Sequence, residues 1–357
     1  MDLRDLRVCV IVPVYQSAAY LPACLDAILA QTHRALQVLL IDDGSTDGSA
    51  DLCDRYARAD PRVEVIHKVN EGQSVARNLG IERCQCPYLF FVDSDDTLPV
   101  DAVAQLLRPL EQGAYDVVAG RLQCVRDGVP EPLPAGVAPG PLRHDPSDRA
   151  RWNRFKVSSD FGYVPKLYRT AFLRQHGIRF DDIRRVLMED TLFNLRVWLE
   201  QPAFFVTDAV VYTYAIRSQT SSNRAMNTIA QRAVRALELY GQAIDAHGTL
   251  ARDLDLAVPL AMRMFCWCLV NNLLYAKPDG KQMRAQIAAF THSEPVMAML
   301  RQPGAARALA TIPSLAQRLF YGYCLRLLRA GRAELLYGTF RLLYPAMLAY
   351  AKSVLNK

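Results

Sequence analysis

The stretch Tyr88-Leu89-Phe90-Phe91-Val92-Asp93-Ser94-Asp95-Asp96 joins an apolar run directly to three carboxylates within four residues. The apolar run has the length and composition of a buried strand. Carboxylates at the end of such a strand are costly unless a cation neutralises them. A hard divalent metal suits this role, because it prefers oxygen ligands such as carboxylates and phosphates. The stretch therefore predicts a buried strand that ends in a metal site.

Strand-like and helix-like runs alternate on both sides of this stretch. Strands are predicted at residues 8–12, 36–41, 63–67, 88–92 and 115–121. Helices are predicted at residues 20–30, 72–84 and 99–110, and from a cap at 46 or 47 to residue 57. This alternation predicts a mostly parallel sheet covered by helices, with ligands beyond the carboxyl ends of its strands.

The rest of the chain divides by composition. Residues 127–149 are rich in Pro and Gly and predict a long surface loop. Mixed structure follows over residues 151–222, and the pattern is helical from there to the end. We therefore expect two domains, a catalytic domain at residues 1–222 and a helical C-terminal region at residues 223–357.

The excess of basic over acidic residues lies in the C-terminal part of the chain. Residues 226–357 hold 16 Lys and Arg against 7 Asp and Glu, and residues 318–357 hold seven basic residues and one acid. Basic, aromatic and amphipathic helices can lie in an anionic membrane interface. The alternative is a helical cap with a solvated basic face. A nucleic-acid-binding module is the least favoured class, because the basic excess lies in an apolar helical tail.

The cysteine pattern and the hydropathy indicate a cytoplasmic protein. The nine cysteines are odd in number and mostly lie in apolar contexts, which predicts reduced core thiols. We expect no signal peptide and no transmembrane helix, because no uncharged apolar stretch reaches about 18 residues. Peripheral attachment to the inner face of the cell membrane through the C-terminal helices is a further hypothesis.

Each acidic motif has a structural alternative. Residues 43–54 match several positions of a calcium loop, but that loop must follow a helix and residues 36–41 predict a strand. Acids in a first helical turn favour the helix dipole, which would account for Glu189-Asp190 and for one or two of the acids at 93–96. Three acids exceed that need, so metal binding is favoured at residues 93–96.

Six short motifs, in this order, resemble the family 2 glycosyltransferases of the GT-A fold. They are Val10-Ile11-Val12-Pro13-Val14-Tyr15, Gln31-Thr32, Ile41-Asp42-Asp43-Gly44-Ser45-Thr46-Asp47, Asn70-Glu71-Gly72, Ala76-Arg77-Asn78-Leu79-Gly80 and Phe91-Val92-Asp93-Ser94-Asp95-Asp96. The resemblance is strong over residues 6–115 and weak over 150–222. It implies an α/β fold with a Rossmann-like, mostly parallel sheet flanked by helices, followed by an all-helical C-terminal region.

The resemblance also implies an activity and its residues. The activity is inverting, metal-dependent transfer of a sugar from a nucleotide-diphosphate sugar, expected to be a UDP-sugar, to a saccharide or lipid-linked acceptor in surface polysaccharide or glycolipid synthesis. The residues expected at the nucleotide-sugar are Pro13, Val14, Tyr15, Asp43, Arg77, Asn78, Asp93 and Ser94. Asp95 and Asp93 would hold Mn²⁺ or Mg²⁺, and Asp190 would be the general base.

The resemblance does not assign a role to Lys166 or to the segment at residues 215–218. Lys166 matches a common basic position of the family whose role we do not assign. The family often has a Tyr-Arg stretch near the phosphates where this chain has Ala215-Ile216-Arg217-Ser218.

The competing enzyme class is a nucleotidyltransferase or another nucleotide-binding enzyme. A dinucleotide enzyme is disfavoured, because no Gly-rich phosphate loop follows the first strand.

Overall fold

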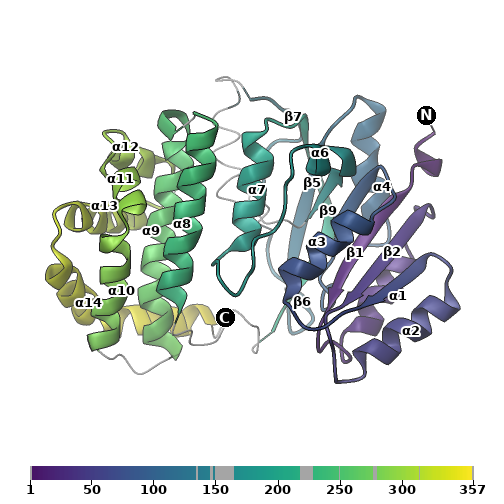
Figure 1. The fold of residues 1–357 in the computed structure, drawn as a ribbon, viewed down its shortest axis with the longest axis horizontal. Coiled ribbons are helices and arrows are strands. Elements are labelled where there is room, and N and C mark those ends of the chain that lie inside the picture. Colours follow the sequence, from purple (N-terminus) through teal and green to yellow (C-terminus); the bar gives the residue numbers. More distant parts are fainter. Residues whose placement is uncertain are drawn as a thin grey trace. The chain divides into compact units, whose positions relative to one another are not determined.

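The structure is a computed structural model of the 357-residue chain. It describes residues 2–133, 136–144, 148, 165–217, 228–248, 250–275, 280–312 and 314–355. The chain divides into two compact units (Figure 1). The first comprises Met1–Ile183 and Glu189–Arg217, and the second comprises Arg184–Met188 and Ser218–Lys357. The expected boundary at residues 222 and 223 lies outside the described residues.

The first unit is built on a nine-stranded sheet of order β3-β2-β1-β4-β8-β5-β9-β7, with β6 paired to β5. The strands are β1 (Val8–Val14), β2 (Leu36–Asp42), β3 (Val63–His67), β4 (Tyr88–Phe91), β5 (Val117–Arg126), β6 (Val129–Pro130), β7 (Gly140–Leu142), β8 (Lys166–Arg169) and β9 (Phe204–Ile216). Strands β1 to β4 pair in parallel, and β8 enters antiparallel between β4 and β5. The predicted α/β fold with a helix-flanked sheet is confirmed, and the sheet is parallel over β1 to β4 and mixed as a whole.

Helices flank this sheet (Figure 1). They are α1 (Leu21–Leu29), α2 (Ser49–Ala59), α3 (Gln73–Arg83), α4 (Ala102–Leu107), α6 (Thr170–Gln175) and α7 (Glu189–Leu199). The predicted helix at 99–110 is shorter than expected and changes to a 3₁₀ turn at Arg108–Glu111. Pro109 accounts for the change, because it lacks the N–H that an α-helix would use there.

The stretch at 127–149 is not loop throughout. Within it, β6 pairs with the end of β5, and β7 pairs antiparallel with the start of β9. Proline is compatible with both strands, because each lies at an edge of the sheet or beside its main path, where a missing N–H removes no ladder bond. The expectation of a long loop was therefore wrong for these short segments.

The core of the first unit includes an aromatic cluster between the sheet and α7. The ring of Phe91 in β4 meets Phe180 and Phe193 edge-on, at centroid distances of 5.4 and 6.1 Å. Phe180 and Phe193 stack at 4.0 Å with an interplanar angle of 5°. Such ring pairs add to the free energy of simple area burial. The cluster fixes α7 on β4, whose end bears the acidic motif.

The second unit is helical, as expected for the C-terminal region. Its helices are α8 (Ile229–Ala246), α9 (Leu250–Tyr275), α10 (Gly280–His292), α11 (Glu294–Arg301), α12 (Ala305–Ala308), α13 (Leu315–Arg329) and α14 (Ala333–Leu355). Among the described residues, none of the helices has the length and apolar character needed to cross a membrane. No disulfide joins the nine cysteines, all of which lie in described segments, and eight of them are buried.

The close packing of α3 on β1 gives a test of the fold. A Cβ at Gly80 would lie 2.4 Å from Cγ2 of Ile11, so Gly80→Ala must displace the Ile11 side chain or move the helix away from the strand. We expect a loss of about 1–3 kcal/mol in the free energy of unfolding, measured by urea denaturation. Gly113→Ala is the control, since its Cβ would meet Tyr115 at an ordinary 3.5 Å. Equal stability of the two variants would contradict this packing.

Candidate active site

Hydrogen bonds join the loops after β1 and β2 at the carboxyl edge of the sheet. Pro13 and Val14 are buried in β1, whereas Tyr15 is 51% exposed. Gln16 takes a positive φ of 51°, and its amide donates to Thr46 Oγ1 at 3.0 Å and accepts from the Thr46 N–H at 3.1 Å. This reciprocal pair holds the loop after Tyr15 in one conformation and leaves the Tyr15 ring accessible to a ligand.

A second bond ties the loop after β1 to the acidic loop after β4. The hydroxyls of Ser17 and Ser94 lie 2.7 Å apart, and both side chains are buried. Ser17 Oγ also donates to the Tyr15 carbonyl at 3.1 Å. The three loops that follow β1, β2 and β4 thus form one connected edge, as the positions of their polar residues predict.

Asp43 is buried at the end of β2 and already accepts three hydrogen bonds. Its Oδ1 accepts from Lys68 Nζ at 2.6 Å and from the Glu71 N–H at 2.9 Å, and Oδ2 accepts from the Gly72 N–H at 2.8 Å. Each carboxylate oxygen can accept two hydrogen bonds, so Oδ2 retains one acceptor position. That capacity is compatible with the expected contact to a base ring.

The three acids after β4 have three different sets of partners. Asp96 is buried and accepts from the Tyr212 hydroxyl at 2.9 Å and from the Ala215 N–H at 3.0 Å. The Asp93 N–H donates to the same Tyr212 hydroxyl at 3.0 Å. Burial, followed by the charge of Asp93, raises the pKa of Asp96 well above its usual value. Asp96 therefore anchors β9 and is not part of the exposed acidic surface.

Asp95 is the most accessible of these acids and faces Arg217. Its side chain is 43% exposed, and Oδ2 accepts from Arg217 Nη1 at 2.9 Å. The other terminal nitrogen of Arg217 donates to the Asp95 carbonyl, and the guanidinium stacks over the Tyr20 ring at 4.1 Å. No role was predicted for Arg217 from the sequence. Its basic charge within the stretch that differs from the family pattern was the only available signal.

The chemistry of Asp93 and Asp95 fits a metal that is shared with a ligand. Burial and then the Asp93 charge raise the pKa of Asp95, and the Arg217 charge opposes this shift, so the anionic form of Asp95 favours nearby cations. Among the described residues, no group of three or more His, Cys, Asp and Glu side chains could hold a metal ion. A metal on these two carboxylates would thus need further oxygen ligands, which a diphosphate provides.

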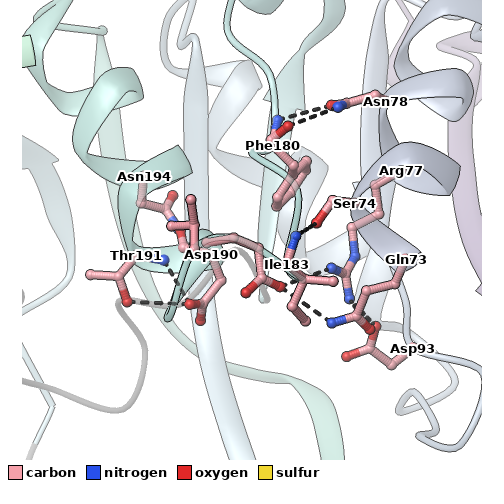
Figure 2. Close-up of polar contacts among 12 residues, drawn as sticks. Gln73, Ser74, Arg77, Asn78, Asp93, Phe180, Ile183, Asp190, Thr191 and Asn194 are labelled. Carbon is pink, nitrogen blue, oxygen red and sulfur yellow. Dashed lines mark hydrogen bonds and ion pairs between the residues drawn. The ribbon is translucent and has the colours of Figure 1, made fainter. Parts of the chain in front are cut away.

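Arg77 connects this acidic loop to α7 (Figure 2). Its side chain is 1% exposed, and its terminal nitrogens lie 3.0 Å from Asp93 Oδ1 and 3.5 Å from Glu189 Oε1. Gln73 accepts from Arg77 at 3.2 Å and donates to Glu189 at 3.2 Å. The structure therefore places Arg77 between two carboxylates, in addition to any contact with a nucleotide-sugar.

Asn78 lies on α3 but directs its amide to a backbone segment. Its Nδ2 donates to the Phe180 carbonyl at 2.9 Å, and its Oδ1 accepts from the Phe180 N–H at 2.9 Å (Figure 2). Asn78 was predicted from the sequence to face the nucleotide-sugar. In the structure both polar groups of its amide are engaged with Phe180.

Asp190 lies in the first turn of α7, directly after Glu189 (Figure 2). Its Oδ1 accepts from the Thr191 N–H at 2.7 Å and from the Thr191 hydroxyl at 3.3 Å. No described residue bonds to Oδ2 of this half-buried carboxylate. Met188, two residues earlier, has a positive φ of 57°, which is unusual for a non-glycine residue. One oxygen of Asp190 is thus fixed and the other is available to a proton donor.

Known proteins with related sequences are glycosyltransferases. Residues 9–176 match the profile of glycosyl transferase family 2. The chain is 30% identical over 232 residues to glycosyltransferase GlyA of Streptococcus pneumoniae, covering 62% of this chain and 32% of GlyA. It is 33% identical over 214 residues to the uncharacterized glycosyltransferase EpsJ of Bacillus subtilis, covering 58% of this chain and 60% of EpsJ. The matches span about a third and three fifths of these relatives.

Solved structures share the fold over nearly the whole chain. S. aureus TarS 1–349 in complex with UDP-GlcNAc has a TM-score of 0.70 at 19% identity, covering 94% of this chain and 92% of that one. The TarS 1–349 complex with UDP has a TM-score of 0.67 with the same identity. The expected GT-A type of fold is confirmed, and residues 9–176 of this chain form a domain of glycosyl transferase family 2.

Proposed function

We propose that the protein is an inverting, metal-dependent glycosyltransferase that moves a sugar from a UDP-sugar to a saccharide or lipid-linked acceptor. One observation carries this proposal. The acidic pair Asp93 and Asp95 and the carboxylate Asp190 lie at the ends of β4 and α7, and Arg77 bonds to both Asp93 and the residue beside Asp190. The carboxylates that would bind the cation and the one that would accept the proton are thus connected through Arg77.

The donor half suits a nucleotide diphosphate. Tyr15 offers an exposed ring for stacking a base, and Asp43 has one acceptor position left on Oδ2. Asp93 and Asp95 would hold Mn²⁺ or Mg²⁺, which supplies positive charge to the departing diphosphate. Arg217 adds a fixed positive charge beside Asp95. TarS, which shares the fold, has been solved with UDP-GlcNAc, and this supports a UDP-sugar as the donor.

The acceptor half suits removal of a proton. An acceptor hydroxyl is a weak nucleophile until a base takes its proton. The Thr191 bonds fix Oδ1 of Asp190, so Oδ2 is the oxygen that would accept this proton. A single in-line displacement then forms the new C–O bond as the bond to the diphosphate breaks, and the anomeric carbon inverts. The alternative, a nucleotidyltransferase, would release pyrophosphate in place of a nucleoside diphosphate.

We also propose that α13 and α14 rest on an anionic membrane. The exposed apolar side chains Leu315, Leu319 and Tyr323 recur every four residues on α13, and Leu335 and Leu342 are exposed on α14. A hydrogen bond of 2.8 Å between Tyr323 and Thr339 joins the two helices. Exposed arginines accompany these side chains: Arg326, Arg332 and Arg341. Apolar side chains with a basic border match the interface of anionic lipids, and a lipid-linked acceptor in surface polysaccharide or glycolipid synthesis would be found there.

The proposed base gives the first test of activity. Asp190→Asn removes the proton acceptor and keeps the size of the side chain, so UDP-sugar turnover should fall by about 10²–10⁴-fold. UDP binding, measured by titration calorimetry with Mn²⁺, should be unchanged. Asp208→Asn, which changes an exposed acid of β9, is the matched control. Turnover at the wild-type rate by Asp190→Asn would remove this residue from the mechanism.

The proposed metal ligand gives a second test. UDP with Mn²⁺ should raise the melting temperature of the wild type, because a ligand of the folded state stabilises it. Asp95→Asn or an excess of EDTA should remove the part of this shift that depends on Mn²⁺. Gln105→Leu, a change on α4, should keep the whole shift. A full shift in EDTA would argue against metal-assisted donor binding.

The membrane proposal is tested by flotation with vesicles. The double variant Leu319→Glu and Leu342→Glu places two acids among the exposed apolar side chains of α13 and α14. We expect its bound fraction on phosphatidylglycerol vesicles to fall several-fold, because both apolar burial and charge attraction are lost. Val129→Glu adds an acid at an exposed position of the first unit and serves as the control. Equal binding by the double variant and wild type would rule out this surface.

A further inference from the structure

The helix α3 bonds repeatedly to a part of the chain that lies more than 100 residues later. Asn78 pairs with Phe180 through two bonds of 2.9 Å, and Ser74 Oγ accepts from the Ile183 N–H at 3.2 Å. Gln73, the residue directly before Ser74, donates to Glu189 at 3.2 Å. Figure 2 shows these contacts along one side of the helix. Side chains of α3 therefore hold Phe180, Ile183 and Glu189, which precede Asp190 in the chain.

The contact of Asn78 is unusually complete. Its amide donates to the carbonyl and accepts from the N–H of the same residue, Phe180, which is the pairing that a neighbouring β-strand would offer. A ligand that bound to the Asn78 amide as donor and acceptor would have to compete with both bonds. An unpaired backbone N–H or C=O is costly when buried, so the pairing is favoured over its loss.

Phe180 transmits this restraint to α7. Its ring stacks on Phe193 at 4.0 Å and lies edge-on to Phe91 at 5.4 Å. Phe193 follows Asp190 by three residues, about one turn of the same helix. A shift of Phe180 would thus move the first turn of α7 relative to β4, and with it the carboxylate of Asp190.

We propose that Asn78 is a positioning residue that aligns Asp190 through Phe180 and does not contact the donor. The role rests on the proposed function, in which Asp190 is the base. A carboxylate displaced by about 1 Å from the acceptor hydroxyl loses much of its effect on the rate, while the nucleotide contacts at Tyr15, Asp43 and Asp95 stay in place. Asn78 therefore affects turnover and leaves nucleotide affinity unaltered.

The test separates turnover from binding in Asn78→Leu. We expect the kcat for UDP-sugar turnover to fall about 10- to 100-fold, while the Kd for UDP with Mn²⁺ stays within about twofold of the wild-type value. Gln105→Leu removes an amide hydrogen bond to Asp101 on α4 and is the matched control. A Kd that weakens in proportion to kcat would show that Asn78 binds the donor, and an unchanged kcat would show that it positions nothing.

Phe180→Leu provides a second route to the same answer if Asn78→Leu folds poorly. It keeps the backbone pair with Asn78 and removes the ring that stacks on Phe193. The expected result is again a lower kcat at an unchanged Kd for UDP. A wild-type kcat for Phe180→Leu would overturn the proposed route through this ring.

Combination with Asp190→Asn separates the role of Asn78 from the proposed function. If Asn78 acts by aligning Asp190, then Asn78→Leu should lower kcat little further once the base is absent. Losses that multiply in the double variant would overturn the role of Asn78 and leave the base assignment intact. A wild-type kcat for Asp190→Asn alone would overturn the base assignment, and the positioning role with it.

Discussion

The guanidinium of Arg77 is almost completely removed from water and lies between Asp93 and Glu189, at 3.0 and 3.5 Å. A buried cation is tolerated only where anions and hydrogen-bond acceptors replace its hydration. The two carboxylates come from separate parts of the chain, the loop after β4 and the start of α7. Folding must bring both to α3, so neutralising this arginine acts together with the aromatic cluster to place α7 beside the acidic loop.

The acidic loop after β4 distributes its charge among partners that organise the site. Asp96 accepts from Tyr212 and from the Ala215 N–H, and these bonds bring the end of β9 to the loop. Arg217 follows two residues later and reaches Asp95. The buried Asp96 therefore positions the end of β9 so that Arg217 lies beside the exposed Asp95. The same loop has a structural carboxylate and two carboxylates whose chemistry fits a metal shared with a diphosphate.

The parts of the fold that depend on local patterns were predictable. Mainly apolar runs located β1 to β4, and the polar residues at the carboxyl ends of β1, β2 and β4 located the edge of the candidate site. The strand β8 was not predicted, because it has only four residues, includes the buried Lys166, and depends on pairing with β4 and β5. The direction of the Asn78 amide could also not be predicted from the sequence. A helical pattern shows which face of α3 is polar, but not which distant backbone will lie against that face.

The start of α3 links the nucleotide side of the site to the base side. Asp43 accepts from the N–H groups of Glu71 and Gly72, which immediately precede the helix, and a carboxylate at this end favours the helix dipole. Gly72 has a φ of 95°, a conformation that a side chain would strain. The carboxylate expected to meet the nucleotide base thus also fixes α3, and α3 in turn holds Phe180 and Glu189 before Asp190. Because one helix connects both halves, a change at Asp43 should disturb the position of Asp190 as well as the affinity for the nucleotide.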